Sequence, residues 1–133
     1  MDKLMEFFSK NDLFARHNNI ELLKAGEGRA LASMKIEPYH FNGAGTVHGG
    51  AIFTLADFAF AVASNSHGKL AMGINTSVNF VKAAVSGTLY AEATEQSLNP
   101  KLASYSVMIT DDDKETVAIF QGMVYRKNES ILK

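Results

Sequence analysis

The 133-residue sequence contains no cysteine, only two prolines and almost no net charge. The lack of cysteine excludes disulfide bonds, thiolate nucleophiles and zinc–thiolate sites, and it fits a reducing compartment, so we expect a cytoplasmic protein. The sequence has 13 basic and 14 acidic residues, a formal net charge of −1, which gives no basis for binding nucleic acid or an anionic membrane surface. We therefore expect neither kind of partner.

Hydrophobic runs that target or anchor a protein are also missing. The first ten residues carry charges within their apolar part and lack a small-residue cleavage motif, so we do not expect a signal peptide. The apolar run at 47–63 is interrupted by His48 and Asp57 and is too short to span a bilayer comfortably. With 47% hydrophobic and 20% charged residues, the chain is typical of a single globular domain over residues 1–133.

The hydrophobic spacing predicts an α+β domain with one dominant helix. We expect a short helical segment at 2–16, strands at 19–25 and 28–37, a long helix at 47–64, and strands at 72–81, 88–98, 102–111 and 115–127. The long helix is apolar almost all round, which indicates that other elements wrap around it, and Gly68 is its expected left-handed cap. We predict an antiparallel sheet of five to six strands curled around this helix, with exposed edges that a second copy would cover.

The first strand after the long helix has an alternating pattern. Its alternating residues form two sets, Met72, Ile74, Thr76, Val78 and Phe80 on the one hand and Gly73, Asn75, Ser77, Asn79 and Val81 on the other. Because side chains alternate along a strand, the pattern assigns the two sets to opposite faces.

Asp57 is a lone carboxylate in the most apolar segment of the chain. We expect it to be buried, and burying a charge is costly without a partner or a function. One interpretation is a carboxylate satisfied by backbone or hydroxyl donors for structural reasons. The other is a catalytic group, and the apolar helix around Asp57 favours this second interpretation.

The turn before the long helix has the sequence NGAGTVHGG at residues 42–50. A helix N-terminus presents unpaired backbone N–H groups and the positive end of the helix dipole. Gly49 and Gly50 have no side chain to block approach, so the Gly49 N–H could hold a carbonyl oxygen that develops negative charge. The same glycines could simply make a tight entry into a packed helix. Asn42 and His48 could contact a ligand or hold the turn.

Gly49 and Asp57 are eight residues apart, which corresponds to about 12 Å along a regular helix. That separation is too long for both groups to act on one carbonyl. Either they serve separate purposes, or a site combines Gly49 of one subunit with Asp57 of another, which agrees with the exposed sheet edges. The remaining histidines, His17, His40 and His67, show no ligand spacing, so we predict no metal site.

Taken together, these motifs resemble the signature of hotdog-fold acyl-CoA thioesterases, most closely the phenylacetate-degradation branch. The residues that carry the resemblance are Asn42, His48-Gly49-Gly50, Leu55-Ala56-Asp57, Asn65-Ser66, Asn79-Phe80-Val81-Lys82 and Ala118-Ile119-Phe120-Gln121-Gly122. The similarity extends from about residue 28 to 127. It implies a hotdog fold, a homodimer with a continuous sheet, and dimers that pair into homotetramers.

The resemblance also implies an activity and its residues. The substrate would be an aryl- or medium-chain acyl-CoA, hydrolysed to the free acid and CoA without a separate cofactor, because coenzyme A is part of the substrate. The Gly49 N–H would polarise the thioester carbonyl, and Asp57 of the neighbouring subunit would act as nucleophile or as general base on water. Asn42 and His48 would orient the carbonyl or the loop.

The expected substrate-binding residues are Gly50, Asn65, Thr76, Ser77, Lys82 and Lys101. The family uses a Ser or Thr near the start of the strand after the helix, but the position that aligns most directly is Gly73, so either Thr76 or Ser77 would take this role. Lys82 and Lys101 are candidates for contacts to the CoA phosphates. Two alternatives stay open: a hotdog enoyl- or hydroxyacyl-CoA hydratase, and a non-catalytic acyl-CoA-binding module.

Overall fold

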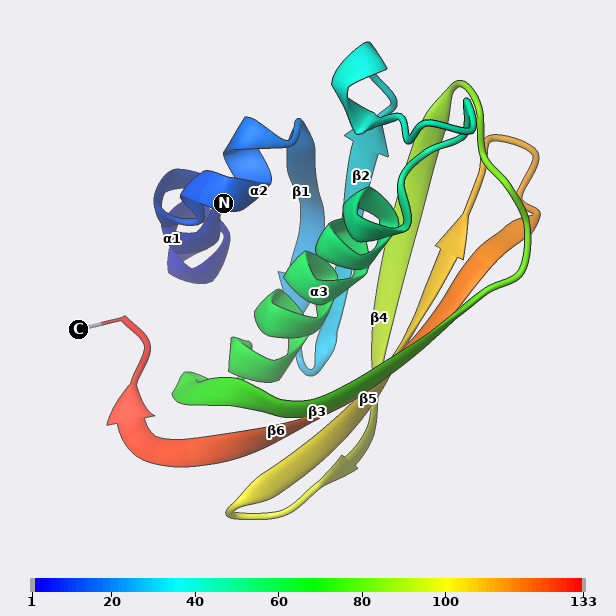
Figure 1. Ribbon diagram of the computed structural model, residues 1–133. Helices are drawn as coiled ribbons and strands as arrows, with labels where there is room; N and C mark the ends of the chain where they lie inside the picture. The colour runs from blue at the N-terminus through cyan, green and yellow to red at the C-terminus, as the bar shows by residue number, and fades with distance from the viewer. Residues whose placement is uncertain (1, 133) are drawn as a thin grey trace.

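A long helix, α3 (Gly49–Asn65), lies in the concave face of a six-stranded antiparallel sheet in the computed structural model, which describes residues 2–132 (Figure 1). The other elements are α1 (Lys3–Asn11), α2 (Leu13–His17), β1 (Ile20–Gly26), β2 (Arg29–Lys35), the 3-10 turn η1 (Pro38–His40), β3 (Lys69–Phe80), β4 (Thr88–Leu98), β5 (Leu102–Thr110) and β6 (Thr116–Ser130). The strand order is β1-β2-β4-β5-β6-β3. This confirms the predicted fold class. Within the described residues, no helix is long and apolar enough to cross a bilayer.

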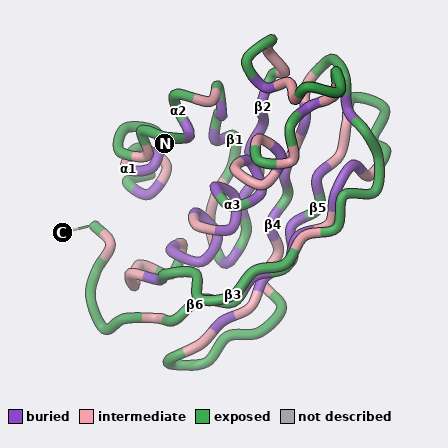
Figure 2. Tube along the Cα trace, in the orientation of Figure 1, coloured by how far each residue is buried: buried purple, intermediate pink, exposed green. Residues whose placement is uncertain are grey.

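The core forms where α3 meets the inner face of the sheet. Most of α3 is buried, as are the inner-facing residues of β4 and β5 (Figure 2). Ala32, Ala91 and Ala93 are completely buried on β2 and β4. Such small side chains allow the helix backbone to approach the sheet closely. The apolar helix is therefore wrapped by strands, as its composition predicts.

The C-terminal end of α3 is fixed to the start of β3 by Asn65. This buried side chain accepts a hydrogen bond from the Ala71 N–H at 2.9 Å and donates to the carbonyl oxygens of Ala71 and Ala61 at 3.2 and 2.8 Å. Gly68 follows with φ of +93°, which confirms the predicted left-handed residue after the helix. Asn65 and Gly68 together turn the chain from the helix into the sheet.

The alternation predicted for β3 is wrong over its first half. A β-bulge places Gly73 opposite Val124 and then Asn75 opposite Met123, so Ile74 is an extra residue. Gly73 and Thr76 therefore both lie on the α3 side of the sheet, although the alternation assigned them to opposite faces, and Met72 lies on the outer face. The cause is the pairing with β6, which the sequence of β3 alone does not reveal.

The two edges of the sheet differ in what covers them. At one edge, α1 and α2 contact β1. At the other edge, β3 carries four apolar side chains that are each more than half exposed, Met72, Ile74, Phe80 and, just beyond the strand, Val81. The edge prediction is thus confirmed for β3, whose paired side faces β6 and whose other side is open.

The N-terminal helical segment packs on α3 from the β1 side. The rings of Phe8 and Phe58 meet edge to face, with centroids 6.2 Å apart. Each N-terminal helix has an aspartate as its N-cap: Asp2 accepts from the Met5 N–H and Asp12 accepts from the Ala15 N–H. Asp12 also marks the corner where α1 ends and α2 begins.

Candidate active site

The first amide of α3, the Gly49 N–H, has no acceptor among residues 2–132. The next amide, that of Gly50, donates to His48 Nδ1 at 2.8 Å, and the Ala51 and Ile52 amides donate to the His48 carbonyl oxygen at 2.9 and 3.2 Å. The Gly49 donor is therefore left free at the positive end of a 17-residue helix. An oxygen that develops negative charge would be stabilised at this position.

The ring of Phe80 covers Gly49. A Cβ atom on Gly49 would lie 3.2 Å from Phe80 Cζ, so any larger residue would push against the ring. Phe80 is the last residue of β3 and is itself half exposed. The free amide thus lies beside the open edge of the sheet. The contact of Phe80 with Gly49 was not predicted, because the sequence signals place Phe80 only in the strand pattern and in the family resemblance.

Asn42 shapes the loop that leads into α3. Its Oδ1 accepts from the Ala44 and Thr46 amides at 2.9 and 3.1 Å, and its Nδ2 donates to Thr46 Oγ1 at 3.0 Å. Asn42 was expected either to contact a ligand or to hold the turn. Its contacts within the structure are those of a residue that holds the turn.

His48 is exposed and caps α3 through Nδ1. Because Nδ1 accepts a hydrogen bond from Gly50, the neutral ring carries its proton on Nε2. The Nε2–H group of His48 can therefore donate a hydrogen bond to a ligand. His48 directly precedes Gly49, so this donor lies close to the free Gly49 amide. His48 can serve both the loop and a bound carbonyl.

Asp57 is exposed in the single chain, contrary to the expected burial. The sheet and the N-terminal helices cover most of α3, and the open stripe contains Gly50, Thr54, Asp57 and Ala61, which follow each other at helical spacing. Among the described residues, nothing donates a hydrogen bond to the Asp57 carboxylate and no cation pairs with it. The carboxylate is available to a ligand or to a second subunit.

The pKa of the Asp57 carboxyl is raised above its ordinary value. The larger cause is partial desolvation. Although Asp57 is exposed to solvent, neighbouring protein atoms displace part of the water around its carboxylate, which disfavours the charged form. The smaller cause is the negative charge of Asp12. Both effects make Asp57 a better proton acceptor than an ordinary surface aspartate.

Gly49 and Asp57 do not meet within one chain. Helix α3 runs without a break from Gly49 to Asn65, so their eight-residue separation corresponds to about 12 Å along its axis. A single carbonyl cannot reach both groups. A site that uses both must draw one of them from another copy of the chain.

Thr76, rather than Ser77, faces α3. Thr76 pairs with Gly122, and a Cβ on Gly122 would point at Phe60 of the helix. Ser77 pairs with Gln121 and lines a hollow of about 360 Å³ with Gln96 and Ser104 on the outer face of the sheet. The register thus separates the two hydroxyls that sequence analysis left as alternatives.

Gly73 has a packing reason to lack a side chain. A Cβ at this position would lie 3.0 Å from Phe60 Cε2. A Ser or Thr at this position, as the family resemblance implies, would compete with the Phe60 ring for the same space.

Asn65, Lys82 and Lys101 were expected to bind substrate, and each has different surroundings in the structure. Asn65 is buried at the far end of α3, where its amide binds backbone groups. Lys82 donates to Asp111 Oδ2 at 2.7 Å and to Glu115, and these hydrogen bonds raise the pKa of Lys82. Lys101 lies in the β4–β5 turn, at the opposite end of the sheet from the start of α3 (Figure 1). Within one chain, Asn65 and Lys101 lie away from Gly49, and Lys82 is bound by the Asp111 and Glu115 carboxylates.

No group of three or more metal-type side chains occurs within residues 2–132. The donors near the start of α3 are the Gly49 amide and the His48 ring, and the exposed acid of the same helix is Asp57. These groups suit binding and hydrolysis of a polarised carbonyl compound.

Comparison with known proteins identifies the family. The model of the "Thioesterase superfamily" matches residues 44–118. A protein of Archaeoglobus fulgidus, named as a candidate esterase, is 41% identical over 130 residues, which are 97% of this chain and 84% of that protein. The acyl-coenzyme A thioesterase PaaI of Escherichia coli is 33% identical over 118 residues, 88% of this chain and 84% of that protein.

The fold agrees with a solved structure of this group. The structure of the E. coli PaaI protein from the phenylacetic acid degradation operon superposes with a TM-score of 0.91 at 31% identity, over 94% of this chain and 91% of that one. The matched segment 44–118 includes both the free amide of Gly49 and the unpartnered carboxylate of Asp57. The chain belongs to the thioesterase superfamily and has its hotdog fold.

Proposed function

We propose that this thioesterase hydrolyses an acyl-CoA to the free acid and coenzyme A in a site shared between two subunits. The observation that carries the proposal is the free Gly49 N–H at the positive end of α3. A thioester carbonyl oxygen gains negative charge when its carbon is attacked, and this amide would hold that oxygen. The E. coli relative named as an acyl-coenzyme A thioesterase supports the choice of substrate.

Asp57 of the second subunit would supply the attack on the carbonyl carbon. As a general base, it takes a proton from water, the resulting hydroxide adds to the carbonyl carbon, and the C–S bond breaks to release the CoA thiolate, which is then protonated. As a nucleophile, its carboxylate displaces the CoA thiolate to give an anhydride, which water then hydrolyses. The raised pKa of Asp57 supports the base route.

The second subunit would pair along β3. The exposed apolar side chains of Met72, Ile74, Phe80 and Val81 support this interface. Phe80 belongs to this edge and also covers Gly49, so a subunit that pairs along β3 would approach the free amide. Two such dimers would then pair into a tetramer, as the family resemblance implies.

The acyl group would be an aryl or medium-chain group. Phe53 is only partly buried next to the open stripe of α3, and Phe80 is exposed beside Gly49, so both offer apolar surface to it. For the CoA phosphates, Lys101 is better supported than Lys82, because its ammonium group has no side-chain partner within residues 2–132. Lys82 would first have to break its ion pairs with the carboxylates of Asp111 and Glu115.

The proposal is tested by measuring thiol release from phenylacetyl-, hydroxybenzoyl-, short-chain and long-chain CoA esters. Asp57→Asn should lose at least about 100-fold in kcat. Asp113→Asn is the matched control, because Asp113 is an exposed aspartate in the β5–β6 turn. A change of only a few-fold in Asp57→Asn contradicts the catalytic assignment, and hydration of an enoyl-CoA without thiol release would point to a hydratase.

The shared site is tested with mixed oligomers. Gly49→Val should be inactive because its side chain collides with Phe80 and blocks the amide. When Gly49→Val and Asp57→Asn chains are co-expressed, a mixed dimer contains one site with both native residues. We expect recovery of about a quarter of wild-type activity from random pairing. If the two inactive chains give no activity after mixing, the site is not shared.

A further inference from the structure

Asp12 lies at the corner between α1 and α2, beside the turn of α3 that carries Asp57. The corner is held there by the edge-to-face contact of Phe8 with Phe58, the residue after Asp57. Asp12 and Phe58 line the same hollow of about 860 Å³, which extends between the N-terminal helices and β1 and β2. Helix α2 contacts α3 directly. The N-terminal segment thus brings a second carboxylate close to Asp57.

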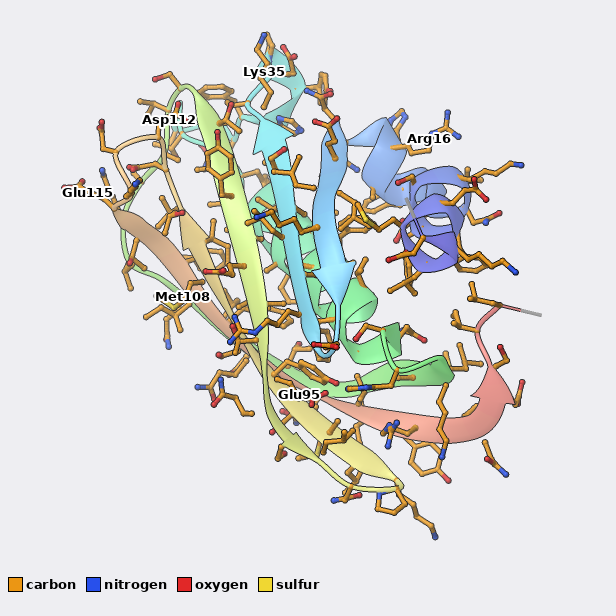
Figure 3. All side chains as sticks on the ribbon, turned by 180° about the vertical axis from the view of Figure 1, so that it is seen from behind. Arg16, Lys35, Glu95, Met108, Asp112 and Glu115 are labelled. Carbon is orange, nitrogen blue, oxygen red and sulfur yellow. The ribbon has the colours of Figure 1, made fainter. Side chains whose placement is uncertain are left out.

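The Asp12 carboxylate is fixed in place. Its Oδ1 accepts the Ala15 N–H at 3.1 Å as the N-cap of α2, and the residue is half-buried. The other charged residues along the hollow are Arg16, Glu21 and Lys35, of which Arg16 and Lys35 are labelled in Figure 3. None of these forms an ion pair with Asp12 or Asp57 within residues 2–132. Among the charges of residues 2–132, the negative charge of Asp12 contributes to the raised pKa of Asp57, after desolvation.

We propose that Asp12 is a positioning residue for Asp57 and holds a fixed negative charge beside the carboxylate that acts on the thioester. The inference rests on the proposed role of Asp57. A neighbouring negative charge favours the protonated form of a carboxyl group, so it strengthens that group as a base. The N-terminal helices, which lie outside the matched family segment, would thereby tune the chemistry of α3.

The chain offers a closely matched pair of variants. Asp12→Asn removes the charge but keeps the cap, because Asn caps helices as well as Asp does. Asp2→Asn makes the same change at the N-cap of α1, where Asp2 accepts the Met5 N–H at 2.9 Å and does not act on Asp57. The two variants have the same net charge and the same capping chemistry.

The test is the pH dependence of kcat/KM between about pH 4 and 8, which reports the essential groups of the free enzyme. We expect the acid limb of Asp12→Asn to move to lower pH and Asp12→Ser to reproduce that shift, while Asp2→Asn follows the wild type. The ¹³C titration of the Asp57 carboxyl should move in the same direction without any substrate. High salt should reduce the difference, because it screens charges near the surface.

Two results would overturn the inference. One is an acid limb and a carboxyl titration in Asp12→Asn that both coincide with the wild type. The other is an equal shift in Asp2→Asn, which would indicate a general effect of net charge. Failure of the proposed function looks different, because Asp57→Asn would then keep its activity whatever Asp12→Asn does.

Discussion

The ring of Phe60 lies against Gly122 so closely that a Cβ atom on this glycine would be 2.7 Å from Phe60 Cζ. Gly73, on the neighbouring strand, faces the same ring. The ring also contacts Tyr105 and Phe120, with centroids 5.9 and 5.3 Å apart. Gly73 on β3 and Gly122 on β6 therefore leave a space that the Phe60 ring fills. This space, the Phe60 socket, determines how closely α3 packs against the sheet.

Gly122→Ala should destabilise the protein by about 1–3 kcal/mol, the usual cost of overpacking a core. Urea denaturation measures this change, and the double variant Gly122→Ala with Phe60→Leu should recover part of it. Gly43→Ala is the control, because a Cβ at Gly43 meets nothing within 4 Å. If Gly122→Ala is no less stable than Gly43→Ala, the Phe60 socket does not constrain the helix.

Asn65→Ala should lower the free energy of unfolding by about 2–3 kcal/mol, because it leaves the buried amide and carbonyl of Ala71 without partners. The KM for acyl-CoA should stay near the wild-type value. Asn11→Ala, which removes an exposed side-chain contact to the Phe7 carbonyl, serves as the control for stability. A large rise in KM with unchanged stability would instead support the substrate-binding role predicted from the family resemblance.

Thr76→Val should reduce kcat/KM by about tenfold or more, because the Thr76 hydroxyl is the one on the side of α3. Ser77→Ala should stay within about twofold of the wild type, because Ser77 faces the outer hollow. Steady-state kinetics on the preferred acyl-CoA separates the two. The reverse order of effects would contradict the assignment of faces from the β3–β6 register.

Asp57→Asn should be more stable than the wild type at pH 7. The Asp57 pKa is raised, so the folded chain keeps this proton at pH values where the unfolded chain has lost it. The charge therefore lowers the free energy of unfolding as pH rises from about 3.8 through the raised pKa. We expect a gain of about 0.5 kcal/mol, since water screens an exposed carboxylate.

The gain should shrink at pH 4, where the wild-type carboxyl is increasingly protonated in both states. Urea denaturation of Asp57→Asn and the wild type at pH 7 and pH 4 measures this difference in the free energy of unfolding. Equal stability of the variant and the wild type at pH 7 would show that the carboxylate is not desolvated in solution.

The sequence was sufficient for the fold because its signals are local. The apolar helix predicted at 47–64 is found as α3, and the predicted strands are found close to their expected bounds. The bulge in β3 could not be predicted, because it depends on how Gly73 and Asn75 pair with another strand. The faces of Thr76 and Ser77 follow from that same pairing.

The candidate site was only partly predictable for the same reason. Asp57 stands out in the sequence because it interrupts an apolar segment, but its exposure depends on which side of α3 the sheet leaves open. Asp12 is the N-cap of α2, but nothing in the sequence indicates that this corner packs near Asp57. Long-range packing, rather than local pattern, decides which charges become neighbours.

The unequal edges of the sheet limit how far copies of the chain could associate. Because α1 and α2 contact β1 while β3 is bare, we expect a second molecule to extend the sheet at β3. Once two β3 edges meet, the outermost strand on each side of the joined sheet is β1, which α1 and α2 contact. We expect growth of the sheet to end there, so that the chain forms a pair rather than a fibre.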